Sequence, residues 1–129
     1  MSPAETEPAD WIARARDDLR VPEVVSKTDD LPDWPAGFHL QQAAEKALKA
    51  VLIARGRTAP RTHDLEQLAS VVDSMEPTMA GWADRLSGLV DFGVAQRYPG
   101  VPEPSIDVEL AIVTVRELLR AASAACGLG

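Results

Sequence analysis

Four polar side chains of a kind that binds anions recur at helical spacing in the middle of the chain. His39, Gln42, Lys46 and Lys49 are separated by three, four and three residues, so they share one face of a helix. An imidazole, an amide and two ammonium groups on one face could bind the phosphate of a nucleotide or another anionic ligand. The same residues could instead form a solvated helix face on which Glu45 and Lys49 make an i,i+4 ion pair. The residue pattern alone leaves both interpretations open.

Arg97 and Tyr98 form a second candidate site, near the end of a helix that we expect to begin at about Pro77. The apolar residues of that helix form one stripe, and Arg97 continues the stripe by helical phase. A guanidinium at the apolar seam of a bundle needs a negative partner, because burying an unpaired charge is too costly. The partner could be a carboxylate at the end of the bundle, with Tyr98 packed beside it. It could also be a phosphate that Arg97 faces in a cleft.

Other side chains with catalytic or metal-binding potential do not form a recognisable site. His63 and Asp64 are adjacent, but a metal-dependent phosphohydrolase needs several more ligands, and the chain has only two histidines. Three aspartates between residues 29 and 33 lack the glycine and the final glutamate of a calcium-binding loop. Cys126 has no histidine close to it in the sequence. We therefore assign no catalytic residue, no metal site and no cofactor from the sequence.

Length and composition indicate one domain over residues 1–129, with a flexible N-terminal segment at residues 1–9. The chain has 20 acidic and 13 basic side chains, and its net charge of −7 is unlike that of an autonomous nucleic-acid binder. A single cysteine cannot form an internal disulfide bond. No apolar stretch is long enough to cross a membrane, and the N-terminus does not resemble a signal peptide. These features favour a cytoplasmic protein that binds no membrane.

Helical periodicity and the positions of proline and glycine predict an all-α protein. We expect Asp10 and Thr62 to be the N-caps of two helices. Pro22 should end or kink the first helix, and Gly56 should cap the C-terminus of the second. Helices of this length, joined by short loops, are typical of an up-and-down helical bundle of about five helices. The expected helices cover about residues 10–20, 36–55, 62–72, 77–98 and 105–126.

The last expected helix, which Ser105 caps, is apolar on two sides. One side carries Val108, Ala111, Ile112, Val115, Leu118 and Leu119. The other side carries Ile106, Leu110 and Val113, and only a narrow charged stripe separates the two. A helix of this kind is either central in the bundle or shared with a partner chain. The second apolar side is therefore our candidate for a dimer surface.

Several segments resemble the HEPN domain family, whose name stands for higher-eukaryote and prokaryote nucleotide-binding. The most specific is FHLQQAAEKALKAVLIARG at residues 38–56, and PRTHDL at 60–65, RYP at 97–99 and ARDDL at 15–19 also fit. The resemblance covers the chain from Trp11 to Leu119. It implies an up-and-down α-helical bundle that is usually dimeric. It also implies a prokaryotic setting beside small nucleotidyltransferases, or in defence or toxin–antitoxin loci.

Many HEPN proteins are metal-independent ribonucleases, and their signature is an arginine, four to six residues and then a histidine on a late helix. In such a pair the histidine acts as an acid or base, and the arginine stabilises charge on the phosphate. No histidine follows Arg97 in this chain. The only literal match, from Arg57 to His63, falls in the loop before the third expected helix, and we interpret it as accidental.

The resemblance therefore predicts a homodimeric binding protein that partners a small nucleotidyltransferase or binds a nucleotide, RNA or another anionic ligand. The alternative is a divergent metal-independent ribonuclease, in which Arg97 would work with His39 or His63. In the favoured hypothesis, the ligand-binding residues are His39, Gln42, Lys46, Lys49, Arg97 and Tyr98.

Overall fold

The structure is a computed structural model that describes residues 7–25, 27, 34–58, 60–90 and 107–128. Every regular element among these residues is a helix, and they include no strand. The prediction of an all-α helical bundle is therefore confirmed. The elements are α1 (Pro8–Val25), α2 (Trp34–Ala54), α3 (Leu65–Met75), the 3-10 helix η2 (Pro77–Met79), α4 (Trp82–Arg85) and α6 (Val108–Ala125).

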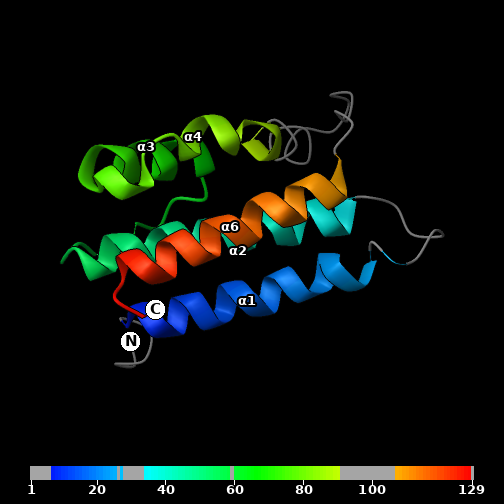
Figure 1. Ribbon diagram of the computed structural model, residues 1–129, viewed down its shortest axis with the longest axis horizontal. Helices are drawn as coiled ribbons and strands as arrows, with labels where there is room; N and C mark the ends of the chain where they lie inside the picture. Colours follow the sequence, from blue (N-terminus) through cyan, green and yellow to red (C-terminus); the bar gives the residue numbers. More distant parts are fainter. Residues whose placement is uncertain (1–6, 26, 28–33, 59, 91–106, 129) are drawn as a thin grey trace.

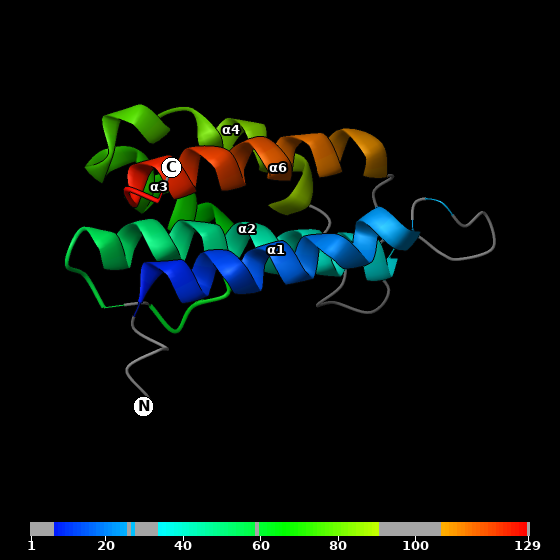
Figure 2. The same cartoon turned by 60° about the horizontal axis from the view of Figure 1, so that its bottom comes forward.

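Three long helices, α1, α2 and α6, lie side by side and form the body of the bundle (Figure 1 and Figure 2). The chain runs in α1 in the direction opposite to that in α2 and α6 (Figure 1). The shorter helices α3 and α4 lie on the side of α2 and α6 that faces away from α1 (Figure 1). α2 is the central element, because α1, α3 and α6 all pack against it.

The core surrounds α2, and the composition of this helix explains how its neighbours can approach it. The side chains of Ala43, Ala44, Ala47 and Ala50 are fully buried and short, so adjacent helices can pack closely against them. Larger side chains fill the space that remains between the helices. Those contributed by α2 are Leu40, Leu48, Val51 and Leu52. α1 and α3 each bury one apolar stripe as well: Ile12, Ala15, Leu19, Leu65, Leu68, Ala69 and Val72.

Two helices have a different N-cap from the one predicted. Asp64, rather than Thr62, caps α3, and its carboxylate accepts a hydrogen bond at 3.0 Å from the amide three positions on. Thr62 instead accepts a hydrogen bond from the amide of Asp64. Asp107, rather than Ser105, caps α6 in the same way at 3.1 Å. An aspartate satisfies an unpaired amide and also places negative charge at the positive end of the helix dipole.

α1 is longer at both ends than its sequence pattern predicts. It begins at Pro8, whose fixed φ suits a first helical turn, so Asp10 lies inside that turn and is not the cap. It ends at Val25, so Pro22 lies inside the helix and does not end it; the alternative expectation, a kink at Pro22, stays a prediction. Pro22 is buried, and burial of its ring offsets part of the cost of its missing amide donor.

The segment after α3 is broken where we expected one continuous helix. Gly81 follows η2 with a left-handed φ of 89°, which glycine adopts at little cost, and α4 begins immediately after it. Residues 87–90 are helical again. The remainder of the expected helix, including Arg97 and Tyr98, lies outside the described residues. Gly56, with a φ of 82°, follows the end of α2 as predicted.

Candidate functional site

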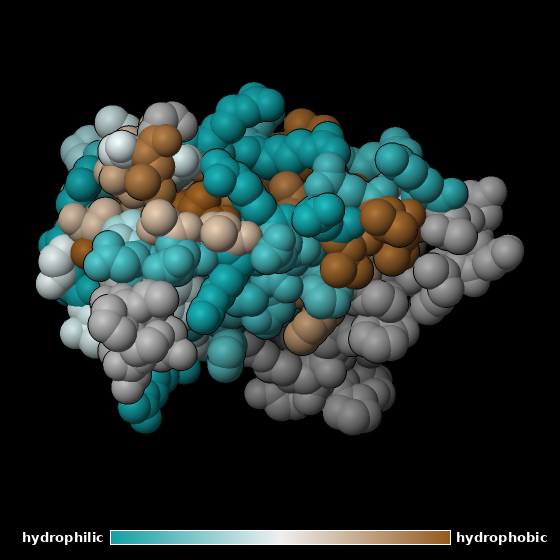
Figure 3. Space-filling model, turned by 90° about the horizontal axis from the view of Figure 1, so that it is seen from below, coloured by the Kyte–Doolittle hydropathy of each residue, from teal (hydrophilic) through white to brown (hydrophobic). Residues whose placement is uncertain are grey.

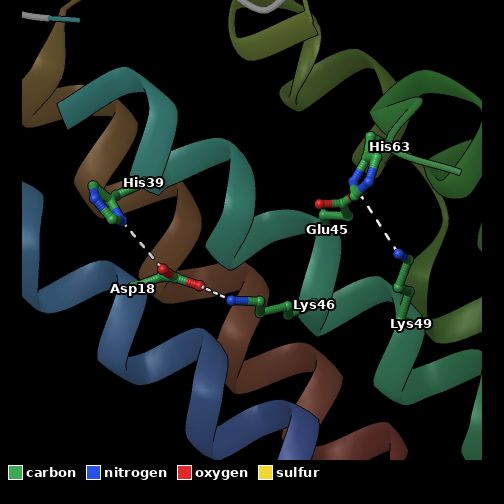
Figure 4. Close-up of polar contacts among 6 residues, drawn as sticks. All are labelled: Asp18, His39, Glu45, Lys46, Lys49 and His63. Carbon is green, nitrogen blue, oxygen red and sulfur yellow. Dashed lines mark hydrogen bonds and ion pairs between the residues drawn. The ribbon is translucent and has the colours of Figure 1, made fainter. Parts of the chain in front are cut away.

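Asp18 joins two of the predicted ligand-binding residues across the seam between α1 and α2. Its Oδ1 lies 3.1 Å from Nδ1 of His39, and its Oδ2 forms an ion pair with Nζ of Lys46 (Figure 4). His39 and Lys46 are seven residues apart on α2, so both side chains reach the same neighbouring helix. The Asp18 side chain is mostly buried, and the positive charge of Lys46 compensates the negative charge of its carboxylate. This contact ties α1 to α2.

Glu45 organises a second cluster, which connects α2 to the chain just before α3. Its Oε1 lies 2.6 Å from Nδ1 of His63 and 3.7 Å from Nζ of Lys49 (Figure 4). Only 4% of Glu45 is exposed, and Lys49 is also buried. In contrast, 71% of the His63 side chain is exposed. One buried carboxylate is thus satisfied by a buried ammonium group and a surface imidazole.

Lys49 has a second favourable contact, with an aromatic ring of α1. Its Nζ lies 5.8 Å from the ring centroid of Trp11, and Cζ of Arg14 lies 5.9 Å from the same centroid. A cation close to an indole ring is attracted by the negative charge of the ring face. Glu45 and Trp11 together therefore compensate for the burial of the Lys49 ammonium group.

These contacts bear on both interpretations of the polar face of α2. The i,i+4 pair of Glu45 and Lys49 is present, but it is buried and does not lie on a solvated face. His39 and Lys46 both contact the carboxylate of Asp18, and Lys49 forms an ion pair with Glu45. Gln42 lies on the same helix and is partly buried. Three of the four predicted residues are therefore paired with carboxylates of the protein itself, and the fourth, Gln42, lies on the same helix.

Sequence reasoning missed Asp18 as a member of this site. Asp18 lies 21 residues before His39 and 28 residues before Lys46, so no local spacing rule connects them. The available signal was its place in the ARDDL segment, which follows the pattern of the family's first helix. The contact between Glu45 and His63, across 18 residues, was missed for the same reason.

Glu45 orients His63 in a way that suits acid–base chemistry. The carboxylate accepts a hydrogen bond from Nδ1, so Nε2 is the basic nitrogen when the ring is neutral. A buried carboxylate that fixes an imidazole also occurs in enzymes that use histidine as a general base. Within the part of the chain that the structure describes, no group of three or more His, Cys, Asp or Glu side chains could hold a metal ion.

A groove of about 230 Å³ lies between α6 and the chain that follows α4. Its lining includes Leu89, Leu110, Ala111 and Thr114, together with the charged residues Arg85 and Asp107. The guanidinium of Arg85 stacks on Trp82, with Cζ 4.0 Å from the ring centroid, and forms an ion pair with Glu117 of α6. Asp107 is engaged as the cap of α6. The charged groups of the groove therefore have partners, and its other walls are mainly apolar.

Comparison with known proteins identifies the family. The model of the HEPN domain matches residues 8–124, from the first residue of α1 almost to the end of α6. The chain belongs to the HEPN domain family. This membership confirms the resemblance inferred from the four sequence segments.

One curated relative is the "Putative toxin MJ1304" of Methanocaldococcus jannaschii, to which this HEPN chain is 34% identical over 95 residues. The aligned region covers 69% of this chain and 61% of the relative. The chain thus spans about three-fifths of the length of the curated relative that it matches. No solved structure matches the chain.

Proposed function

We propose that this HEPN protein is a binding protein that forms a homodimer and works together with a small nucleotidyltransferase. The observation that carries the proposal is the uncovered apolar side of α6. Leu110 is 62% exposed and Val113 is 47% exposed, whereas Ile112 and Val115 on the other side of the helix are buried. Leu110 also lines the groove beside α6. Large apolar side chains left uncovered next to a groove favour contact with another protein chain.

The face over α1 is a weaker candidate for such a contact. Seen from below, where α1 lies closest to the viewer, the surface is mainly hydrophilic and its apolar patches are separate (Figure 3). The exposed pair of Asp17 and Arg20 contributes to this polar surface. No helix in the described ranges is long and apolar enough to cross a membrane. The exposed side of α6 is therefore the surface that we assign to a protein partner.

A nucleotide or another anionic ligand is the less supported part of the proposal. Asp18 and Glu45 already match the positive charges on α2, so an anion would have to compete with carboxylates inside the protein. For this reason we place a protein partner before an anionic ligand. If an anion does bind, the proposed contacts are His39, Gln42, Lys46, Lys49, Arg97 and Tyr98.

The name of the relative supports a place for this chain in a toxin–antitoxin pair, with the nucleotidyltransferase as the other member. We nevertheless expect the purified protein not to cleave RNA, because no histidine follows Arg97 in the sequence. Incubation with RNA, followed by gel electrophoresis, tests this expectation. RNA fragments that form with the natural chain and disappear with Arg97→Ala would establish the ribonuclease alternative.

The proposed dimer is tested by measuring molar mass with light scattering after size-exclusion chromatography. The natural chain should elute as a dimer, and Leu110→Glu and Val113→Glu should elute as monomers with unchanged helix content. These substitutions place a charge in an apolar contact without disturbing the core. The matched control is Val24→Glu, because Val24 on α1 is 67% exposed and should not lie in the interface. A dimer that survives both α6 substitutions would exclude this surface.

The proposed partner is tested by coexpression with the nucleotidyltransferase encoded nearest to this chain in its genome. A tag on the HEPN chain should recover both proteins in a constant ratio. Coexpression with an unrelated nucleotidyltransferase is the control, because recovery of both enzymes alike would show nonspecific binding. If the neighbouring enzyme is not recovered, the partner assignment is wrong even if the dimer is confirmed.

A further inference from the structure

The helices α3 and α4 lie on a body of three helices that has its own internal contacts. α1, α2 and α6 each pack against the other two, whereas α3 packs against α2 and η2 packs against α6. α3 and α4 lie on the side of this body that faces away from α1 (Figure 1). We call residues 65–90, which contain α3, η2 and α4, the α3–α4 unit. If this unit moved away, the contacts among α1, α2 and α6 would remain.

Apolar packing holds the α3–α4 unit closed on the body. The buried side chains of the unit include Leu65, Leu68, Val72, Met79 and Trp82. Exposing these side chains to water is unfavourable. The closed state therefore dominates, and an open state is a rare excursion from it.

Polar contacts at the edge of the α3–α4 unit add only a little to this closure. Arg55, His63 and Arg85 are all exposed, and an exposed ion pair stabilises a protein weakly because solvent screens the charges. Water can therefore replace their contacts when the unit moves. The polar contacts between the body and the unit, or the chain just before it, are Glu45–His63, Arg55–Glu76, Arg85–Glu117 and the hydrogen bond from Gln41 to the carbonyl oxygen of Leu89.

Asp73 gives the closed state a cost that an open state does not have. Its Oδ1 is buried and, among the side chains that the structure describes, it is the only buried polar atom without a hydrogen-bond partner. Asp73 lies on α3, inside the α3–α4 unit. A buried polar group without a partner is destabilising, because it has lost its contact with water and gained nothing in exchange. When the unit opens, water can reach this oxygen, so Asp73 favours opening.

The α3–α4 unit also forms one wall of the groove beside α6. Arg85, Gly88 and Leu89 line this wall, and Leu110 and Thr114 belong to the wall that α6 forms. We propose that residues 65–90 open as one unit away from the body, and that this opening controls whether the groove exists as a binding surface. A partner chain that contacts both walls binds only the closed state, so its binding and the closure of the unit are linked. This link rests on the proposed function, whereas the opening itself does not.

Hydrogen–deuterium exchange of the full chain, followed by NMR, tests the opening. The most protected amides of α3 and of residues 82–90 should share one protection factor, because a single event exposes both. That factor should be at least about tenfold lower than the factor of the most protected amides in α1 and α2. The proposal is overturned if the two parts of the unit exchange at different rates, or if they are protected as strongly as α2.

The ion pair of Arg85 with Glu117 distinguishes opening of the unit from opening of the whole bundle. Arg85→Ala removes this pair and should raise the exchange rate of the α3–α4 unit about two- to fivefold, while α1 and α2 keep their rates. The matched control is Arg116→Ala, which removes an exposed ion pair between α6 and Glu23 of α1. This control should leave exchange in the unit unchanged. Equal effects of the two variants on the unit would mean that the unit and the body open together, which would overturn the proposal.

The contribution of Asp73 is tested by a change in the opposite direction. Asp73→Ala should lower the exchange rate of the α3–α4 unit by about fivefold or more, because the closed state no longer buries an unpaired oxygen. Ser70→Ala, at an exposed position of α3, controls for the higher helix propensity of alanine. If Asp73→Ala slows exchange no more than Ser70→Ala does, the role of Asp73 in opening is wrong.

Val113→Glu tests the link to the partner surface, because Val113 is exposed outside the described lining of the groove. Residues 82–90 should exchange more slowly in the dimeric natural chain than in this variant as a monomer, because the second chain holds the unit closed. Equal rates in dimer and monomer would overturn the link and leave the dimer in place. If Val113→Glu is still a dimer, the proposed partner surface is wrong and the link falls with it, while exchange in the natural chain alone decides the opening.

Discussion

Replacing Glu45 with leucine should destabilise the bundle, because Lys49 would then be buried without its carboxylate. Both side chains are almost completely buried, and Nζ of Lys49 lies 3.7 Å from Oε1 of Glu45. Removing one partner of a buried ion pair typically costs about 3–5 kcal/mol. The long contact distance and the nearby Trp11 ring place the expected loss at the lower end, about 3 kcal/mol. In a domain of this size, such a loss lowers Tm by roughly 10 °C.

A second substitution separates the effect of charge from that of packing. The double variant Glu45→Leu/Lys49→Met replaces both charged groups with apolar groups of similar size, and such replacements of buried pairs are often neutral or stabilising. It should therefore recover most of the stability that Glu45→Leu loses. Asp17→Asn is the control, because this exposed aspartate lies 3.9 Å from Arg20 and the change should cost less than about 0.5 kcal/mol.

Urea unfolding followed by circular dichroism at 222 nm measures the free energy of unfolding of each variant. The slope of that free energy against urea concentration should be the same for all of them, since the substitutions alter no more than local contacts. The reasoning fails if Glu45→Leu loses less than about 1 kcal/mol, or if the double variant is no more stable than the single one. Either result would mean that Lys49 finds another partner or becomes solvated when Glu45 is absent.

Three further predictions follow from individual contacts. Asp64→Ala should destabilise α3 by about 1 kcal/mol, and Thr62→Ala should cost clearly less, as measured by urea unfolding, because the aspartate is the cap. Leu48→Ala should cost about 2–5 kcal/mol in the same assay, since Leu48 is fully buried in the core. Burial raises the pKa of the Cys126 thiol above its usual value, although the charge of Arg55 acts in the opposite direction. Less thiolate is then present near pH 8, so iodoacetamide should alkylate Cys126 more slowly than a free cysteine, and the rate should continue to rise at higher pH.

Properties that depend on residues within about one helical turn could be predicted from the sequence. The 3.6-residue period identified the buried face of α3, because Leu65, Leu68, Ala69 and Val72 follow one another at that spacing. Helix boundaries were less predictable. Thr62 and Asp64 can both accept a hydrogen bond from an amide, and the backbone conformation in the folded chain made Asp64 the cap. The break at Gly81 was missed because the apolar stripe continues on both sides of it.

The amino-acid sequence alone determined the helical class, the family and the faces that are buried, because neighbouring residues encode these properties. Only the tertiary structure showed which charges meet. Asp18 reaches His39 and Lys46 through the antiparallel register of α1 on α2, and Glu45 reaches His63 because the chain returns to α2 before α3. These distances depend on how whole helices pack against one another. For that reason, His39, Lys46 and Lys49, which in the sequence look available to bind an anion, contact Asp18 and Glu45 in the folded protein.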